Sequence, residues 1–332
     1  MSEFWHDKKV AVTGADGFIG SHLVEMLIEK GASVRALAYY NSFGSRGWLD
    51  DVDKSLMEGL EVMWGDVRDS RCMNELVKDR EIVFHLASLI AIPYSYQAPQ
   101  SYVQTNVVGG LNVLEACRDN DVSRLIHTST SEVYGTAQYV PIDEKHGLQP
   151  QSPYSATKIA ADMIADSYYR SFGLPVAIAR PFNTYGPRQS ARAVIPTILS
   201  QLHKGMTEIK LGAVSPTRDF NYVVDTCSGF LAIAENDQTC GKVTNIGSGR
   251  EISIKDLFDL CVKVTGKKAK VIADDKRLRP DKSEVNRLMC DDSEIKSTTG
   301  WKPAFTLEEG LHLTSEWIED HLDIFRPEEY NI

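Results

Sequence analysis

Two polar groupings in the middle of the chain have residue types and spacing suited to acid–base chemistry. One is TSTSEVYG at residues 128–135, which gathers hydroxyl and carboxyl groups, and the other is SPYSATK at residues 152–158. Tyr154 and Lys158 lie four positions apart, so a helix places both on one face. A Lys ammonium near a phenol favours the phenolate and lowers the tyrosine pKa below its ordinary value of about 10. This spacing predicts that Tyr154 acts as a base near neutral pH.

A strand and a helix are expected to position these groups. RLIHTST at residues 124–130 is apolar and β-rich, which predicts a buried strand that ends beside Glu132. Ligands bind at the carboxyl ends of strands in an open α/β sheet. Ser152 followed by Pro153 is typical of a helix N-cap and first turn. We therefore expect the helix that carries Tyr154 to begin there.

A glycine-rich turn near the start of the chain indicates dinucleotide binding. The strand KKVAVTG is followed by GADGFIGSHLVEMLIEKG, in which Gly14, Gly17 and Gly20 are spaced as GxxGxxG. Gly14 permits the tight turn, Gly17 lets the backbone approach a pyrophosphate, and Gly20 lets the helix pack close to the strand. The N-terminus of this helix directs free N–H groups at the phosphates.

The second strand, SVRALAYY at residues 33–40, departs from the usual pattern. An NAD-binding unit normally carries Asp or Glu at this strand's end to hold the ribose hydroxyls, and none is present here. Asn41 or Ser42 can bind the ribose instead, whereas Arg35 or Arg46 can meet a 2′-phosphate. We expect NAD, but these residues alone leave NADP open.

Strands continue to alternate with helices, which predicts an α/β fold with a Rossmann-type, doubly wound parallel sheet. Expected strands are residues 61–64, 81–88 and 175–183, and a helix is expected near 101–118. The apolar, aromatic stretch 89–99 reads as a loop that either contacts a sugar or packs in the core. We expect an NAD-binding Rossmann domain at 1–182, to which 219–255 returns, and a smaller carboxyl-terminal α/β substrate domain at 183–332.

The composition excludes several classes of function. Of 332 residues, 42% are hydrophobic and 25% charged, and the net charge of −10 argues against nucleic acid or an anionic membrane as a partner. Six cysteines without a CxxC pair, together with no signal peptide or membrane-spanning run, predict a cytoplasmic protein. His85, His127 and His203 have no metal-ligand spacing, so no metal site is expected.

Five motifs resemble the extended short-chain dehydrogenase/reductase family, which contains the nucleotide-sugar epimerases and dehydratases. They are GADGFIG, TSTSEVYG, YSATK, RPFNTYGPRQ and PTRDF. Within that family, IPYSYQAP, EVYGTAQYVPIDEKH, RPFNTYGPRQSARAVIPT and RLRPDKSEV look most like the 4,6-dehydratases of legionaminic acid biosynthesis. The resemblance implies an NAD-dependent lyase that converts nucleotide-linked N-acetylglucosamine to the 4-keto-6-deoxy sugar and regenerates its cofactor.

The resemblance also implies catalytic roles. Tyr154, assisted by Lys158, takes the proton of the sugar C4 hydroxyl, to which Thr130 hydrogen-bonds. The C4 ketone acidifies the C5 proton, and Glu132 removes it. Many 6-deoxy-sugar dehydratases read Thr-Asp-Glu, with the Asp protonating the departing C6 oxygen, whereas this chain has Ser131 in the middle. We hypothesise that Glu132 carries the C5 proton to the C6 oxygen while Ser131 orients that hydroxyl.

Binding residues follow from the same resemblance. The cofactor is expected to contact Gly14, Asp16, Gly17, Phe18, Ile19, Gly20, Asn41, Ser42, Asp66, Val67, Leu86, Ala87, Ser88, Asn106, Thr128, Tyr154, Lys158 and Pro181. The nucleotide-diphosphate sugar is expected to contact Ile92, Tyr94, Asn183, Val194, Arg218 and Arg279, with the two arginines clamping the diphosphate. A homodimer through the helices near 101–118 and 153–171 is implied, and larger homo-oligomers are compatible with it.

Three alternatives stay open. A UDP-glucuronate decarboxylase also carries Thr-Ser-Glu, but it needs a cation near C6, and the 89–99 stretch contains none. A nucleotide-sugar 4-epimerase needs no carboxylate beside Thr130. A non-catalytic nucleotide-binding scaffold is disfavoured by the intact set of Thr130, Glu132, Tyr154 and Lys158. The residues do not distinguish GDP-, UDP- and dTDP-linked sugars.

Overall fold

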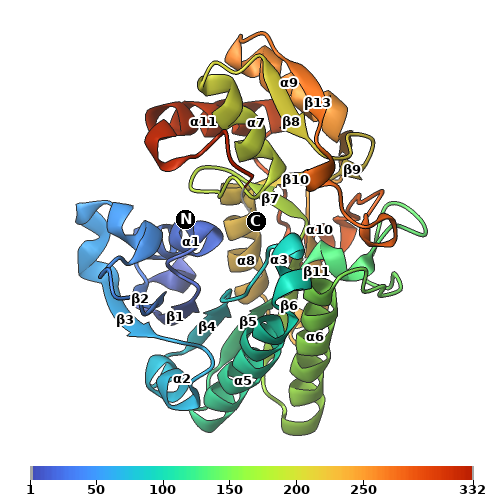
Figure 1. Cartoon of the computed structure of the whole chain (residues 1–332). Helices are drawn as coiled ribbons and strands as arrows, with labels where there is room; N and C mark the ends of the chain where they lie inside the picture. Colours follow the sequence, from blue (N-terminus) through green and yellow to red (C-terminus); the bar gives the residue numbers. More distant parts are fainter. Residues whose placement is uncertain (1–2, 331–332) are drawn as a thin grey trace.

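A parallel sheet forms the centre of the molecule in this computed structural model, which describes residues 3–330 apart from the side chains of residues 54, 57, 58 and 281. Within these residues the sheet has seven strands in the order β11-β6-β5-β4-β1-β2-β3, all paired in parallel (Figure 1). The strands are β1 (Lys9–Thr13), β2 (Ser33–Tyr39), β3 (Leu60–Gly65), β4 (Ile82–His85), β5 (Arg124–Thr128), β6 (Val176–Pro181) and β11 (Val243–Ile246). The predicted Rossmann-type fold is confirmed.

Helices cover both faces of this sheet because alternate strand residues point to opposite sides. Val10 and Val12 of β1 pack into one buried cluster with α1 and α8, whereas Ala11 packs into a second cluster with α2, α5 and α6. The helices are α1 (Phe18–Glu29), α2 (Ser70–Val77), α3 (Ile92–Gln97), α4 (Pro99–Tyr102), α5 (Gly109–Asp119), α6 (Pro153–Phe172), α7 (Val194–His203), α8 (Val223–Ala234), α9 (Ile254–Thr265), α10 (Ser293–Thr299) and α11 (Leu307–Asp320). A π-helical stretch, Val103–Val108, joins α4 to α5.

The strand order reverses at β1, so that β1 and β4 are neighbours at the topological switch point of the sheet. The strands β2 and β3 extend the sheet on one side of β1, and β4, β5 and β6 extend it on the other. In doubly wound sheets the crevice outside the carboxyl ends at this switch point is the ligand-binding position. The glycine-rich turn after β1 and residues 86–88 after β4 both lie there.

The carboxyl-terminal half forms a second layer of structure above the sheet (Figure 1). It contains α7, α9, α11 and short two-stranded sheets. Their strands are β7 (Asn183–Tyr185), β8 (Glu208–Leu211), β9 (Thr217–Arg218), β10 (Phe220–Tyr222), β12 (Ile252–Ser253) and β13 (Lys270–Ala273). Of the segment expected to return to the central sheet, β11 does so beside β6, while β10 pairs with β7 and β12 with β9.

The stretch 89–99 is not a loop as expected. It contains α3, and α4 begins at Pro99. Both helices carry proline in their first turn, where its missing N–H costs no hydrogen bond and its fixed φ suits the helix. The apolar composition of this stretch therefore reflects short helices that pack beside α6.

Contacts from several elements tie the second layer to α1 and its neighbouring loop. Arg188, which precedes α7, forms two 2.8 Å hydrogen bonds to Glu25 of α1. Trp48, in the loop between β2 and β3, packs edge-on against Trp317 of α11 with ring centroids 5.5 Å apart. These contacts fix the second layer over the switch point of the sheet.

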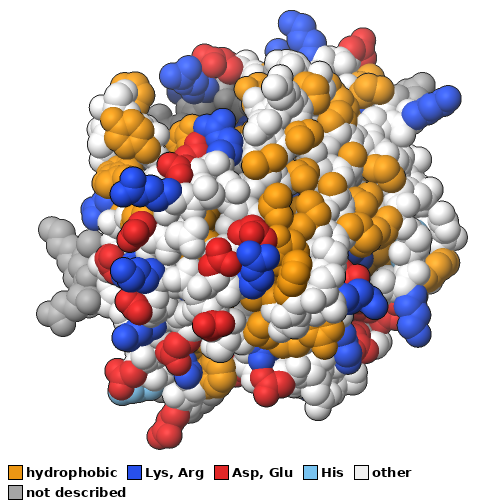
Figure 2. Space-filling model, turned by 90° about the horizontal axis from the view of Figure 1, so that it is seen from below, with side chains coloured by type: hydrophobic (Ala, Val, Ile, Leu, Met, Phe, Trp, Pro, Cys, Tyr) orange, Lys and Arg blue, Asp and Glu red, His pale blue; other side chains and the backbone are white. Residues whose placement is uncertain are grey.

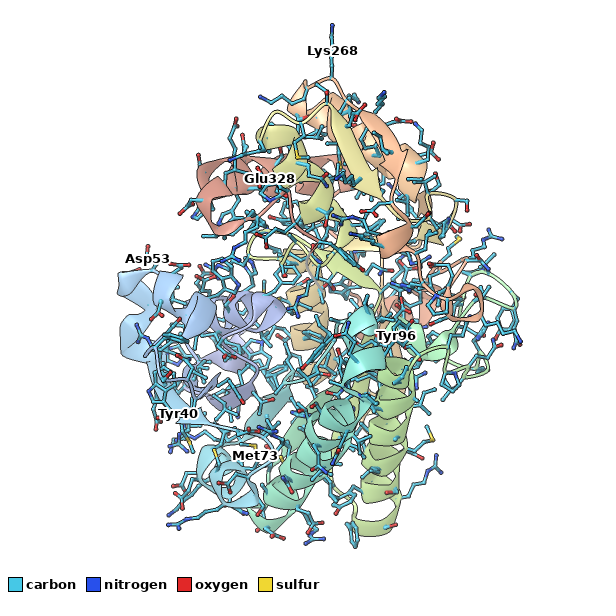
Figure 3. All side chains as sticks on the ribbon, viewed as in Figure 1. Tyr40, Asp53, Met73, Tyr96, Lys268 and Glu328 are labelled. Carbon is cyan, nitrogen blue, oxygen red and sulfur yellow. The ribbon has the colours of Figure 1, made fainter. Side chains whose placement is uncertain are left out.

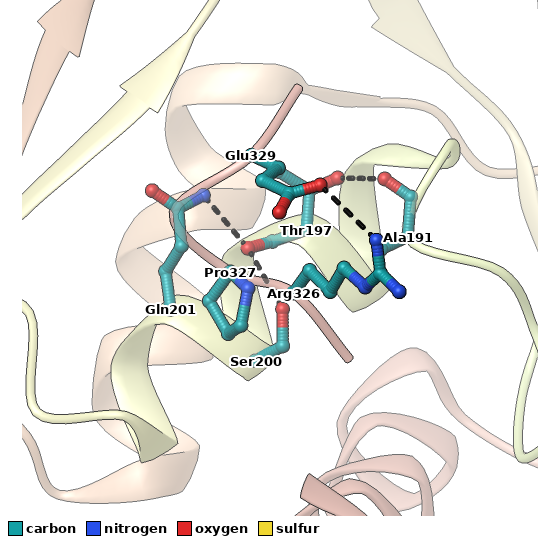
Figure 4. Close-up of a pocket in the computed structure, with 7 residues that line it drawn as sticks. All are labelled: Ala191, Thr197, Ser200, Gln201, Arg326, Pro327 and Glu329. Atoms are coloured by element: carbon teal, nitrogen blue, oxygen red, sulfur yellow. Dashed lines mark hydrogen bonds and ion pairs between the residues drawn. The ribbon is translucent and has the colours of Figure 1, made fainter. Parts of the chain in front are cut away.

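The last described segment supports α7. Figure 4 shows Arg326, Pro327 and Glu329 beside α7, with Arg326 and Glu329 paired at 3.6 Å. Thr197 of α7 donates a 2.6 Å hydrogen bond to the carbonyl of Ala191, which holds the loop that enters this helix. Among residues 3–330 no helix combines the length and apolarity needed to cross a bilayer.

Candidate active site

The end of β5 presents the first polar grouping. Thr130 caps the short 3-10 helix Ser131–Tyr134 by accepting a hydrogen bond from the Glu132 N–H at 3.2 Å. The side chains of Ser131 and Glu132 are almost fully buried. The sequence around Thr130 thus delivers a hydroxyl and a carboxyl to the carboxyl end of the sheet, as expected from the strand at 124–130.

The helix α6 presents the second grouping. It begins at Pro153 behind Ser152, which forms a reciprocal capping box with Ser155, as predicted for an N-cap. Tyr154 and Lys158 are buried on the face turned toward β5. The Lys158 ammonium donates a 2.6 Å hydrogen bond to the Thr128 carbonyl, and the Tyr154 hydroxyl hydrogen-bonds to Thr130. The structure therefore brings the two groupings together.

The expected lowering of the Tyr154 pKa is wrong. Burial of the hydroxyl raises the pKa of Tyr154 above its ordinary value, and the hydrogen bond from Thr130 only partly opposes this. Burial also lowers the pKa of Lys158 to about 8. Desolvation of both groups therefore outweighs the effect of the ammonium charge on the phenol.

A buried charged network lies beneath Lys158 and was missed by sequence reasoning. Asp162, one helical turn after Lys158, accepts hydrogen bonds from Ser129 at 2.6 Å and from Arg180 at 2.9 and 3.2 Å. His127 lies 3.4 Å from its second oxygen. Burial alone would raise the pKa of Asp162, but His127 and Arg180 outweigh burial and hold it below its ordinary value. The sequence signal that could have revealed this network is Asp162 itself, an acidic residue four positions after Lys158 and so on the same face of the predicted helix.

Replacement of Asp162 by Asn is expected to destabilise the fold. The change leaves the Arg180 guanidinium buried without a charged partner, which costs about 3–5 kcal/mol in comparable buried pairs. Urea denaturation measures the free energy of unfolding. Asp166→Asn is the matched control, because Asp166 lies one turn further along α6 and pairs with Arg170 at the surface. Equal effects of the two changes would contradict a structural role for the buried network.

Glu132 also belongs to a cluster of two arginines and two glutamates. Arg279 lies 3.9 Å from Glu132 and 3.9 Å from Glu284, and Arg218 donates to Glu284 at 3.2 Å. Nη1 of Arg279 is buried without a hydrogen-bond partner in the described structure. The predicted diphosphate clamps are thus adjacent, and Glu284, which sequence reasoning missed, lies between them. A guanidinium with one buried, unused donor nitrogen is suited to an anionic ligand.

The glycine-rich turn forms a close cradle that fits a dinucleotide. Gly14 has φ of +66°, and a Cβ there would lie 2.7 Å from the Ala87 nitrogen. A Cβ on Gly20 would lie 2.0 Å from the Gly14 carbonyl. The helix α1 has no side chain capping its N-terminus at Gly17, so its first N–H groups are available to phosphate. Thr128, at the end of β5, adds a buried hydroxyl that has no hydrogen-bond partner among the described residues.

One amide holds the loop after β4 in place. Asn106, in the π-helical stretch, accepts hydrogen bonds from Ser88 and Leu89 and donates to Thr157 of α6. The Leu86 and Ala87 nitrogens are bound by Thr13 at 3.1 Å. Asn106 was predicted to contact the cofactor. In this structure its side chain holds the loop after β4 against α6. A π-helical turn is a common feature of functional sites.

The other predicted cofactor residues lie at or just after the carboxyl ends of β1, β2, β3 and β6. Phe18 and Ile19 open α1, and Pro181 ends β6. Asp66 pairs with Arg68, and Val67 is buried beneath Gly109. Asn41 organises its own loop through Tyr39, Phe43 and Ser45, while Ser42 is exposed.

The four other predicted nucleotide-sugar contacts come from three separate segments. Ile92 is buried and Tyr94 is exposed on α3, Val194 begins α7, and Asn183 begins β7 with a buried Oδ1 that has no partner in the described structure. Tyr102, which sequence reasoning did not single out, packs against Tyr154 with ring centroids 6.3 Å apart. Across the described residues, no group of three or more His, Cys, Asp or Glu is arranged to hold a metal ion.

The geometry agrees with what comparison to known proteins shows. A family model described as GDP-mannose 4,6 dehydratase matches residues 11–314. The chain belongs to this family. The resemblance of its motifs to the short-chain dehydrogenase/reductase-type epimerases and dehydratases is thereby confirmed.

Members of the family and solved relatives cover nearly the whole chain. A dTDP-glucose 4,6-dehydratase of Actinoplanes is 31% identical over 314 residues, which are 93% of this chain and 97% of that protein. The structure of a UDP-N-acetylglucosamine 4-epimerase from Methanobrevibacter ruminantium, in complex with UDP-N-acetylmuramic acid, superposes with a TM-score of 0.85 at 31% identity over 95% of this chain and 99% of that one. DesIV, a dTDP-glucose 4,6-dehydratase from Streptomyces venezuelae with NAD bound, has a TM-score of 0.86 at 28% identity over 96% and 99%.

Proposed function

We propose that the protein is an NAD-dependent 4,6-dehydratase of nucleotide-linked N-acetylglucosamine, with a role in the biosynthesis of legionaminic-acid-type sugars. The observation that carries the reaction type is the buried carboxyl of Glu132 beside Thr130 and Tyr154. A dehydratase needs a base at C5 in addition to the group that deprotonates the C4 hydroxyl, whereas a 4-epimerase does not. NAD follows from the glycine cradle and from NAD-bound relatives such as DesIV.

The residues divide the chemistry among themselves. NAD, when bound, supplies reversible oxidation of a carbinol carbon. Tyr154 receives the C4 hydroxyl proton while Thr130 holds that oxygen. Glu132 takes the C5 proton and passes it to the C6 oxygen that leaves as water, and Ser131 orients that oxygen. The diphosphate lies against Arg218 and Arg279, which already face a common carboxylate. The reaction is redox-neutral, so the cofactor stays bound between turnovers.

A UDP-glucuronate decarboxylase is the second candidate because of one observation. The 89–99 stretch itself carries no cation for the C6 carboxylate of that substrate. Arg279, from a distant part of the chain, lies 3.9 Å from Glu132 and supplies a cation at this side of the site. The 4-epimerases among the relatives form the third candidate.

Isotope labelling separates these candidates. The protein is incubated with UDP- and GDP-N-acetylglucosamine in deuterium oxide, and the sugars are followed by mass spectrometry and NMR. Loss of water with deuterium at C5 supports the dehydratase, and the substrate consumed identifies the nucleotide. Inversion at C4 without loss of water would move the protein to the epimerases. If neither sugar changes, loss of carbon dioxide from UDP-glucuronate would establish the decarboxylase.

The rate is expected to stop rising with pH near pH 8, because Lys158 must stay charged to assist the Tyr154 phenolate. The pKa of Lys158 is lowered to about 8, so the ammonium form is present below pH 8 and is lost above it. Below pH 8 we expect kcat/KM to rise with pH as the phenolate forms, and above pH 8 the loss of the ammonium should offset the gain of phenolate. Between pH 8 and 10.5 the unfolded chain binds more protons at Lys158 than the folded chain does, so the free energy of unfolding rises with pH. A kcat/KM value that keeps rising from pH 8 to 10 would argue against this role of Lys158.

A second copy of the chain is the proposed partner. Met163, Tyr169 and Phe172 of α6 and Val103 of the π-helical stretch are exposed. Figure 2, which views the molecule from the end that carries α2, α5 and α6, shows hydrophobic side chains running through the middle of this face, with charged side chains gathered mainly to the left of them. An exposed apolar band of this kind fits a homodimer interface. Sedimentation velocity measures the assembly, and a monomer at micromolar concentration would exclude it.

A further inference from the structure

An acidic side chain does lie at the end of β2, but it belongs to Asp16 in the turn after β1. The strand β2 ends at Tyr39 without Asp or Glu. Oδ2 of Asp16, in the glycine-rich turn after β1, accepts a 2.9 Å hydrogen bond from the Tyr39 N–H. This carboxylate therefore lies where strand β2 meets the cradle, between Gly14 and Gly17. In Rossmann units the ribose hydroxyls of the adenosine half are held at this place.

The position of Asp16 is fixed from a second side. The Trp48 N–H donates a 3.1 Å hydrogen bond to the Asp16 carbonyl. Gly47 has φ of +57°, and a Cβ there would lie 2.4 Å from the same carbonyl oxygen. The loop that follows β2 thus closes on the backbone of Asp16. Its carboxylate has lone pairs beyond the one used by Tyr39, because an ionised carboxylate offers about four acceptor sites.

The arginines near this edge are already neutralised. Arg35 donates to Glu61 at 2.8 Å and to three carbonyls at the end of α2, at 3.0 to 3.2 Å. Arg46 pairs with Asp50 at 2.8 Å, and Arg68 pairs with Asp66 at 2.5 Å. Both arginines that the sequence offered for a 2′-phosphate are therefore engaged with partners in the described structure. A phosphate beside Asp16 would meet like charge without a free guanidinium from these three residues.

We infer that Asp16 is the residue that selects the cofactor, by accepting hydrogen bonds from the adenosine ribose hydroxyls and repelling a 2′-phosphate. The inference rests on the proposed use of a nicotinamide dinucleotide and adds the residue that discriminates NAD from NADP. The glycine-rich turn thus supplies both the phosphate cradle and the acid that β2 lacks. A hydrogen bond to a charged acceptor of this kind changes affinity by about ten- to a hundredfold.

Cofactor binding can be measured without any sugar. The protein is stripped of dinucleotide, and calorimetric titration gives the Kd for NAD and for NADP in wild type, Asp16→Asn and Asp16→Ser. Asn retains an acceptor for the Tyr39 N–H and removes the charge, and thermal unfolding followed by circular dichroism verifies that each variant is folded. Asp53→Asn is the matched control: Asp53 is exposed on the same side of the molecule as Tyr40 (Figure 3), and within the described part of the chain its carboxylate accepts hydrogen bonds from Ser55 alone.

Wild type is expected to prefer NAD, and both Asp16 variants should reduce that preference at least about tenfold. Asp53→Asn should leave it unchanged. An unchanged ratio in both folded Asp16 variants would overturn the inference, and so would an equal change in Asp53→Asn. These results are separable from the proposed reaction: a protein that dehydrates its sugar but shows no change of ratio loses only the role of Asp16. Conversely, a shifted ratio in a protein without dehydratase activity leaves Asp16 in place and removes the substrate assignment.

Discussion

Replacement of Glu132 by Gln should stop both water loss and exchange of the C5 hydrogen with solvent. Gln has nearly the same shape and remains able to face Arg279, 3.9 Å from the native carboxylate, but it cannot take up a proton. Removal of a general base lowers rates by about 10²–10⁴-fold. Deuterium incorporation at C5 is measured by NMR during incubation in deuterium oxide. Oxidation at C4 should still occur, because Tyr154 and Lys158 are unchanged.

The control for this variant is Glu284→Gln, which makes the same change of charge within the same cluster. Glu284 lies as far from Arg279 as Glu132 does, at 3.9 Å, but it pairs with Arg218 rather than lying beside Thr130. We expect Glu284→Gln to alter KM for the nucleotide sugar and to leave C5 exchange largely intact. Dehydration by Glu132→Gln within tenfold of wild type would remove Glu132 from the reaction.

Replacement of Tyr154 by Phe should have an effect at least as large, about 10³–10⁴-fold on kcat, and should act earlier in the reaction. Without the phenol, the C4 hydroxyl proton has no acceptor, so C4 oxidation, C5 exchange and water loss are all lost together. This differs from Glu132→Gln, which spares C4. Phe keeps the ring contact with Tyr102, so the fold is retained. Mass spectrometry of a single turnover distinguishes the two variants.

Tyr102→Phe is the companion control, because it removes the hydroxyl of a neighbouring buried tyrosine whose ring centroid lies 6.3 Å from that of Tyr154. The Tyr102 hydroxyl donates to the Ala91 carbonyl and holds the entry to α3. Its loss should cost about 1 kcal/mol of stability and little activity. If Tyr102→Phe reduced kcat as much as Tyr154→Phe, the effect would be attributable to packing of this aromatic group, and Tyr154 would lose its assignment as the base.

The fold was predictable because its signals are local. The apolar run before Thr130, the glycine spacing from Gly14 to Gly20 and the Ser152-Pro153 helix start each depend on neighbours in sequence. The turn, cap and strand that they predicted are present. The stretch 89–99 was misjudged because prolines at helix starts and prolines in loops look alike without their partners.

The site was only partly predictable because its electrostatics depend on distant residues. Asp162 and Arg180 meet across 18 positions, and Arg279 reaches Glu132 across more than a hundred. The pKa of Tyr154 is decided by burial, which no local pattern reveals. The acid near β2 was sought after the strand, where the family pattern puts it; Asp16 lies 23 positions before Tyr39 and was expected only as a general cofactor contact.

The edge-on contact of Trp48 with Trp317 gives the protein an internal optical signal. Trp48 belongs to the loop that closes on the cofactor turn, and Trp317 stacks flat on His321 with ring centroids 4.3 Å apart. Indole emission responds to the polarity and charge around the ring. A ligand that reshapes the loop should therefore change the intrinsic fluorescence, so that occupancy of the turn can be followed in real time without a label.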